Sequence, residues 1–241
     1  MSDSHQSNEI DRLCRRFEIA VANFGQSCIA MRANEKAFQA WFAASVIQEF
    51  GLSRVYREIH LAKKELLELT SDLEVPQRLR EGNELFPDIS VSWLPDIDAR
   101  HSNTRDHNIR FIGDFLLKFA ILTELKVTGS GGSSTPSQDI KTDLWKLGLF
   151  SLAHTRRKEV LGGMTDQDNV LRTYMVIMDN HSKNGVFRSA YSAARLKDIF
   201  ASLSPRWPHH VIKPTVLVLG SSGERAKMAV YRNFEEESIG L

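Results

Sequence analysis

A long apolar run over residues 115–127 constrains the fold of this 241-residue chain more than any other segment. The run is rich in Phe, Ile and Leu and does not alternate with polar residues. A strand with one face in water alternates with period two, whereas a strand covered on both faces reads as a continuous apolar run. It therefore predicts a central strand in a sheet with helices on both sides, an α/β architecture.

The segments around this run predict the remaining elements by their periodicity. Apolar residues recur at helical spacing over 9–24, over 34–50, from Thr135 onward and over 187–203. Residues 62–82 have the same spacing and are expected to be an insertion between strands. Strand-like patterns lie at 54–61, 86–93, 170–178 and 215–219. We expect one mixed α/β domain over 34–225, an N-terminal amphipathic helical extension over 1–33, and a C-terminal tail over 226–241.

The amino-acid composition excludes a disordered or a fibrous protein. Hydrophobic residues make up 42% of the chain and charged residues 25%, which is ordinary for a globular domain. The two cysteines have no zinc-type spacing, and the polar N-terminus lacks the layout of a signal peptide. With no apolar run of about 20 residues, we expect a cytoplasmic protein without a membrane span. The net charge of +1 gives no global attraction to a polyanion, so nucleic-acid binding would depend on local patches.

Two charged residues stand at the end of the apolar run. Glu124 and Lys126 are two positions apart, so in a strand they share a face, about 7 Å apart, while Leu125 points to the opposite layer. Buried charges are costly unless they are paired or bind a metal. Taken alone, the pair is best explained as an ion pair at a strand end.

Asp88 makes a second interpretation available. It follows a proline at the start of the 86–93 strand, and a hairpin-like pairing would bring it beside Glu124. Two adjacent carboxylates repel each other unless a cation lies between them, and oxygen ligands of this kind suit Mg²⁺ or Mn²⁺ with waters completing the coordination. Lys126 would then stabilise an anionic transition state, or orient and deprotonate an attacking water if its pKa were lowered.

Pro87-Asp88 followed by Glu124-Leu125-Lys126 resembles the signature of the PD-(D/E)XK nuclease superfamily. The order of elements is similar over roughly residues 34–180: a helix carrying a glutamate, a strand, the aspartate strand, the Glu-x-Lys strand and an amphipathic helix at 139–147. The resemblance implies a restriction-endonuclease-like fold, with a mixed central sheet flanked by helices.

The resemblance also implies an activity and roles for individual residues. It implies a Mg²⁺- or Mn²⁺-dependent DNA endonuclease of restriction or defence type, with DNA as partner and a homodimer as the assembly. Asp88, Glu124 and the backbone carbonyl of Leu125 would bind the metal, and Lys126 would position the attacking water or stabilise the pentavalent phosphate. Glu35 would be an accessory acid, although a glutamate in a first helical turn also interacts favourably with the helix dipole.

Two basic clusters are candidates for contacts with nucleic-acid phosphates. They comprise Arg100, Arg105 and Arg110 in the polar stretch after the aspartate strand, and Arg156, Arg157 and Lys158 near the end of the following helix. Solvated charged segments explain the same patterns. Two other functional hypotheses remain: a catalytically inactive module of the same fold that binds nucleic acid or a protein partner, and an unrelated α/β protein in which the motif is accidental.

Overall fold

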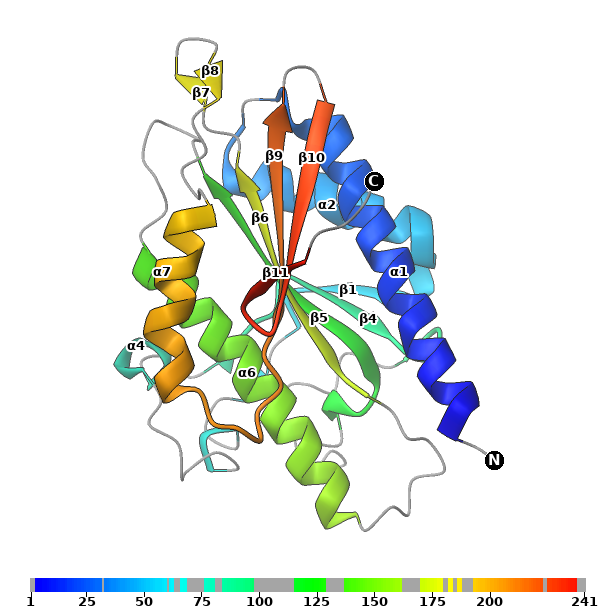
Figure 1. The fold of residues 1–241 in the computed structure, drawn as a ribbon. Helices are drawn as coiled ribbons and strands as arrows, with labels where there is room; N and C mark the ends of the chain where they lie inside the picture. Colours follow the sequence, from blue (N-terminus) through cyan, green and yellow to red (C-terminus); the bar gives the residue numbers. More distant parts are fainter. Residues whose placement is uncertain are drawn as a thin grey trace.

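A computed structural model of the chain contains a seven-stranded mixed sheet between two layers of helices (Figure 1). The sheet has the strand order β1-β4-β5-β6-β9-β10-β11. The structure describes residues 3–31, 33–59, 61–62, 66–68, 76–80, 84–97, 115–128, 137–161, 170–179, 182–183, 186–187, 193–222 and 225–237. The helices and strands are α1 (Asp3–Cys28), α2 (Glu35–Phe50), η1 (Leu52–Arg54), β1 (Val55–Arg57), β2 (Leu61–Ala62), α4 (Gln77–Arg80), β3 (Glu84–Leu85), β4 (Ile89–Ser92), β5 (Phe119–Thr128), α6 (Ser137–Val160), β6 (Arg172–Asp179), β7 (Ser182–Lys183), β8 (Val186–Phe187), α7 (Ala193–Leu203), η3 (Ser204–Arg206), β9 (Thr215–Ser222), β10 (Arg225–Arg232) and β11 (Glu235–Glu237).

The centre of the sheet is parallel and its two sides are antiparallel. β5 pairs with β6 in parallel, and β6 pairs with β9 in parallel. β4 and β1 continue the sheet from β5 with antiparallel pairing, and β10 and β11 do so from β9. Nine of the ten residues of β5 are buried, which confirms the prediction of a strand covered on both faces.

One face of the sheet is covered by α1 and α2. α1 contributes an apolar stripe that includes Leu13, Phe17, Val21 and Phe24, each no more than 2% exposed. These side chains share a core with Leu125 on the underside of β5. The N-terminal helix predicted from the sequence therefore packs into the domain itself, as a layer of its hydrophobic core.

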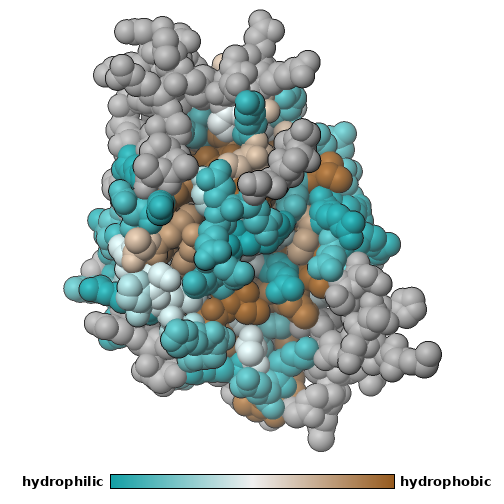
Figure 2. Space-filling model, in the orientation of Figure 1, coloured by the Kyte–Doolittle hydropathy of each residue, from teal (hydrophilic) through white to brown (hydrophobic). Residues whose placement is uncertain are grey.

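The other face is covered by α6 and α7. Leu144 and Leu147 of α6 and Leu196 of α7 lie in a second core with Leu122 of β5. Figure 1 shows these two helices on the opposite side of the sheet from α1 and α2. In the same orientation the described surface is largely hydrophilic, with separate hydrophobic areas between the hydrophilic side chains (Figure 2).

Four segments differ from the sequence prediction. The strand expected over 54–61 is divided into β1 and β2, and β2 pairs with β3 in a separate two-stranded sheet. β5 begins at Phe119, because residues 115–116 form a helical turn before it. α7 begins at Ala193, and the first part of the predicted 187–203 helix contains β8 or lies outside the described residues. Residues 226–232 and 235–237, expected in a tail, belong to β10 and β11, because Ala226, Met228 and Val230 alternate with charged or small residues and pack on the sheet core.

None of the described helices has the length and apolar character needed to cross a membrane.

Gly148 provides a test of how closely Trp207 packs against α6. A Cβ atom at this position would lie 2.6 Å from two ring carbons of Trp207, which is 4% exposed and packs on Trp145. Alanine normally stabilises a helix by about 1 kcal/mol over glycine. Here we expect Gly148→Ala to lower the free energy of unfolding by about 1–3 kcal/mol, because overpacking outweighs that gain.

Chemical denaturation followed by circular dichroism would measure this effect. Thr142→Ala is a control on the half-buried side of the same helix, where Thr142 donates a hydrogen bond of 2.9 Å to the Gln138 carbonyl within the helix. It should change stability by no more than about 0.5 kcal/mol. A stabilised Gly148→Ala variant would contradict the packing described here.

Candidate functional site

Asp88 lies directly against the strand that carries Glu124. β4 and β5 pair antiparallel with Ile89 opposite Thr123, as the hairpin-like pairing predicted. The Asp88 amide donates to the Thr123 carbonyl over 3.0 Å, and the Leu125 amide donates to Asp88 Oδ2 over 2.7 Å. These two hydrogen bonds hold the Asp88 carboxylate beside the Glu124-Leu125-Lys126 segment, although Asp88 and Glu124 are 36 positions apart in the sequence.

Glu124 and Lys126 project from the same face of β5 toward α6. Glu124 is 2% exposed, and its Oε2 lies 2.7 Å from the Lys146 ammonium. Lys126 Nζ lies 3.0 Å from Asp143 Oδ2. Leu125, between them, is fully buried on the opposite face, as the strand periodicity predicts. Glu124 and Lys126 therefore do not pair with each other in the described contacts; each pairs with a residue of α6.

Asp143 and Lys146 were not identified as site residues from the sequence. They stand three positions apart on α6, and their own ion pair measures 3.5 Å. Lys146 also donates a hydrogen bond of 3.1 Å to the Phe86 carbonyl, just before the Pro-Asp segment. Both residues are charged and flank Leu144 and Leu147 of the apolar stripe on α6. This pattern is the sequence signal that would have indicated Asp143 and Lys146 as site residues.

The first turns of α2 reach the same place from the other layer. Asn34 caps the helix by accepting a hydrogen bond from the Ala37 amide over 2.9 Å. Glu35 Oε1 lies 3.7 Å from the Lys126 ammonium, and one turn later Gln39 donates to Asp88 Oδ1 over 3.0 Å. The structure thus brings Glu35 to the cluster and adds Gln39, which sequence reasoning missed.

We call these seven residues the acidic cluster. Its members are Glu35, Gln39, Asp88, Glu124, Lys126, Asp143 and Lys146. Their four carboxylates face two ammonium groups, so two formal negative charges within the cluster are left uncompensated. Such a surplus in a largely buried place favours the binding of a cation.

Burial and neighbouring charges shift the pKa values in this cluster. Burial raises the pKa of Glu124 well above its usual value, against the opposing charge of Lys146, and also raises the pKa values of Asp88 and Glu35. For Lys126, burial would lower the pKa, but the charges of Asp143, Glu35 and Glu124 outweigh burial and raise it. Lys126 is therefore an ammonium at neutral pH. Of the two uses expected for it, this favours charge stabilisation over deprotonation of water.

The residues present fit a hydrated divalent cation. Glu124 Oε1 is buried and has no hydrogen-bond partner in the part of the chain that the structure describes, which leaves one carboxylate oxygen available. No group of three or more His, Cys, Asp or Glu side chains among the described residues has the arrangement of a metal site. Mg²⁺ commonly takes one or two carboxylates and keeps several waters, so Asp88 and Glu124 are sufficient protein side chains for it.

The predicted nucleic-acid contacts do not join the acidic cluster where they are described. Arg156, Arg157 and Lys158 lie in the last turns of α6, ten or more residues beyond Lys146, or about 15 Å along the helix axis. Arg100, Arg105 and Arg110 lie outside the described residues.

Comparison with known proteins does not assign a family or a function to this site. The chain matches no protein-family model, no curated protein and no solved structure.

Proposed function

We propose that this chain is a Mg²⁺-dependent DNA endonuclease of the PD-(D/E)XK type with a restriction-endonuclease-like fold. The observation that carries the proposal is the placement of Asp88 against Glu124 and Lys126 across the β4–β5 pair, with a surplus of negative charge around them. A mixed sheet with helices on both faces agrees with that fold. DNA as the substrate, a restriction or defence role and a homodimeric assembly rest on the resemblance of the sequence motif.

The residues that would hold the metal are Asp88, Glu124 and the carbonyl of Leu125. A bound divalent cation would supply Lewis-acid activation of the phosphodiester and of the attacking water. Gln39 and the Leu125 amide fix the orientation of the Asp88 carboxylate by donating to its two oxygens. The carboxylate is thus pre-organised before any ligand arrives, which lowers the cost of assembling the site.

Lys126 acts in this proposal as a positive charge next to the scissile phosphate. Asp143 and Glu35 hold its ammonium from two sides, at 3.0 and 3.7 Å. An ammonium held in place before the reaction stabilises negative charge that develops on phosphate oxygens in the transition state. Glu35 and Asp143 are then positioning residues for Lys126.

Lys146 has a different place in the same cluster. It pairs with the buried Glu124 and so supplies the positive charge that this carboxylate needs when no metal is bound. A divalent cation and Lys146 compete for the same carboxylate. The buried lysine thus keeps the metal-free protein folded and sets how strongly Glu124 attracts the metal.

The experiment that tests the proposed function is cleavage of supercoiled plasmid DNA with Mg²⁺, with Mn²⁺ and with excess EDTA. We expect nicked or linear products with either metal and none with EDTA, because the two carboxylates alone cannot activate water for this reaction. Cleavage that persists in EDTA would refute metal dependence. DNA binding without cleavage in any divalent metal would instead identify the chain as the inactive binding module considered from the sequence.

A further inference from the structure

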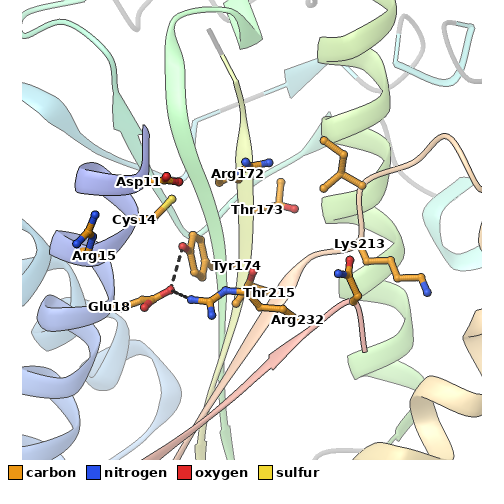
Figure 3. A pocket seen from close by; sticks show the side chains of 12 residues that line it. Asp11, Cys14, Arg15, Glu18, Arg172, Thr173, Tyr174, Lys213, Thr215 and Arg232 are labelled. Carbon is orange, nitrogen blue, oxygen red and sulfur yellow. Dashed lines mark hydrogen bonds and ion pairs between the residues drawn. The ribbon is translucent and has the colours of Figure 1, made fainter. Parts of the chain in front are cut away.

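A polar cavity lies between α1 and the strand ends of β6, β9 and β10 (Figure 3). Its volume is about 500 Å³, within the range of pockets that bind small molecules. The residues that line it are Asp11, Cys14, Arg15, Glu18, Arg172, Thr173, Tyr174, Ile212, Lys213, Thr215, Arg232 and Asn233. We call it the α1 pocket.

The α1 pocket is separate from the acidic cluster. In the β5–β6 register Lys126 lies opposite Ile177, five residues from Arg172, which lines the pocket. Five residues of strand span about 16 Å. Glu124 and Lys126 also project from the face of the sheet that α6 covers, whereas α1 covers the other face. None of the residues in the acidic cluster lines the pocket.

Positive charge exceeds negative charge in the pocket wall. Arg232 is compensated by its ion pair with Glu18 at 2.6 Å and by a second one with Glu237. The remaining cations are Arg15, Arg172 and Lys213, whereas Asp11 is the one other carboxylate lining the pocket. Arg15 and Arg172 form no ion pair with any residue in the described ranges, and Lys213 lies over the Phe234 ring.

The other ionisable groups of the wall do not cancel this positive charge. Burial raises the pKa of the Cys14 thiol, and it raises the pKa of Tyr174 well above the ordinary phenol value. Both groups are therefore neutral near pH 7. Figure 3 shows Tyr174, Glu18 and Arg232 linked in a row at one side of the pocket, where Tyr174 donates to Glu18 over 3.3 Å. This row fixes the side chains on that wall.

Arg172 and Arg15 carry positive charge on the α1 side of the pocket. Arg172 lies opposite Ile121 in the β5–β6 register, and Ile121 belongs to the core beneath α1, so the Arg172 side chain leaves the strand on that face. Thr173 also lines the pocket, but its side chain lies on the other face, because it is opposite Leu122 in the core beneath α6. A ligand on the α1 side would therefore meet these cations and not the Thr173 hydroxyl.

We propose that the α1 pocket binds the phosphate monoester of a nucleotide, either a free mononucleotide or the phosphorylated end of a strand. Arg172 would hold the phosphate, because the planar guanidinium donates two parallel hydrogen bonds to phosphate oxygens. Arg15 would add charge from α1. The volume leaves room for a sugar and base beside the phosphate.

Calorimetry on the full chain tests whether the α1 pocket binds a phosphate monoester. The experiment is carried out in EDTA, which removes any metal from the acidic cluster. A lack of binding would therefore count against this proposal and leave the nuclease proposal untouched. The probes are 5′-AMP, adenosine as the uncharged control, and a single-stranded oligonucleotide with and without a 5′-phosphate. We expect saturable binding of 5′-AMP or of the phosphorylated oligonucleotide, and weaker or no binding of each unphosphorylated partner. Which phosphorylated probe binds more tightly identifies the source of the phosphate.

Variants locate the binding in the pocket. Arg172→Gln should raise the Kd by about tenfold or more, since it removes a charge-assisted contact. Arg12→Gln is the matched control, because Arg12 is on the same helix as the pocket residues of α1 but does not line the pocket, and its guanidinium pairs with Glu9. Thr173→Val should leave the Kd unchanged, because this side chain lies on the other face of the sheet. Equal affinity for AMP and adenosine, an unchanged Kd for Arg172→Gln, or equal effects of Arg172→Gln and Arg12→Gln would overturn the proposal.

Discussion

Replacing Lys126 with methionine is expected to lower the rate of DNA cleavage by about 100-fold or more, since removal of one transition-state charge contact typically costs this much. Methionine keeps the length of the side chain and removes the ammonium that Asp143 and Glu35 hold in place. Glu124→Gln should have an effect of at least the same size. It keeps the shape of the side chain but removes the charge that would bind the metal.

The rate of plasmid nicking in Mg²⁺ at saturating enzyme would measure both effects, with circular dichroism to show that each variant is folded. Lys36→Met is a matched control on α2, because Lys36 is exposed, stands next to Glu35 and makes no ion pair with a described residue. It should cleave at the rate of the unmodified chain. Folded Lys126→Met or Glu124→Gln proteins with undiminished cleavage would rule out this site as the centre of the reaction.

Replacing Lys146 with methionine is expected to destabilise the metal-free protein by about 3–5 kcal/mol, the usual cost of removing one partner of a buried ion pair. Without the ammonium that lies 2.7 Å away, Glu124, at 2% exposure, must either take up a proton or remain as a buried charge without a partner, and both cost stability. Mg²⁺ should then restore part of the loss, because the cation takes over the role of the lysine. The stabilisation by a ligand grows with its affinity for the folded state, and this affinity should be higher without Lys146 as a competitor.

Urea unfolding in EDTA and in Mg²⁺ would measure the two stabilities of each protein. The informative quantity is the gain on adding Mg²⁺, which we expect to be larger for Lys146→Met than for the unmodified chain. Lys141→Met, one turn earlier on α6, removes a lysine that makes no ion pair with a described residue and should behave like the unmodified chain. An equal gain in the variant and in the unmodified protein would show that Mg²⁺ does not compete with Lys146 for Glu124.

Much of the fold follows from local patterns in the sequence. The continuous apolar run predicted a strand with helices on both of its faces, and from Phe119 onward β5 has this environment. The stripe on the N-terminal helix indicated that α1 would be covered, though it could not indicate by what. The last strands were missed, because the charges on β10 made a sheet segment near the edge read as a solvated tail.

The sequence by itself determined the side chains that strand geometry links locally: Glu124 and Lys126 on one face, Leu125 on the other, and Asp88 at the start of a neighbouring strand. Only the tertiary structure decided what each of them contacts. Lys146 and Asp143 meet the strand because α6 packs across it, and Gln39 meets Asp88 because α2 reaches the same place from the other layer.

The sequence alone suggested an ion pair between Glu124 and Lys126, whereas in the structure each of them pairs with a residue of α6. Strand periodicity fixes which face a residue takes, since it depends on neighbours in the chain. The charge state of Lys126 depends instead mainly on the carboxylates of Asp143 and Glu35, which come from separate helices, and their field together with that of Glu124 keeps it protonated. Such fields fall off over a few ångströms, so they exist only after distant segments have packed together.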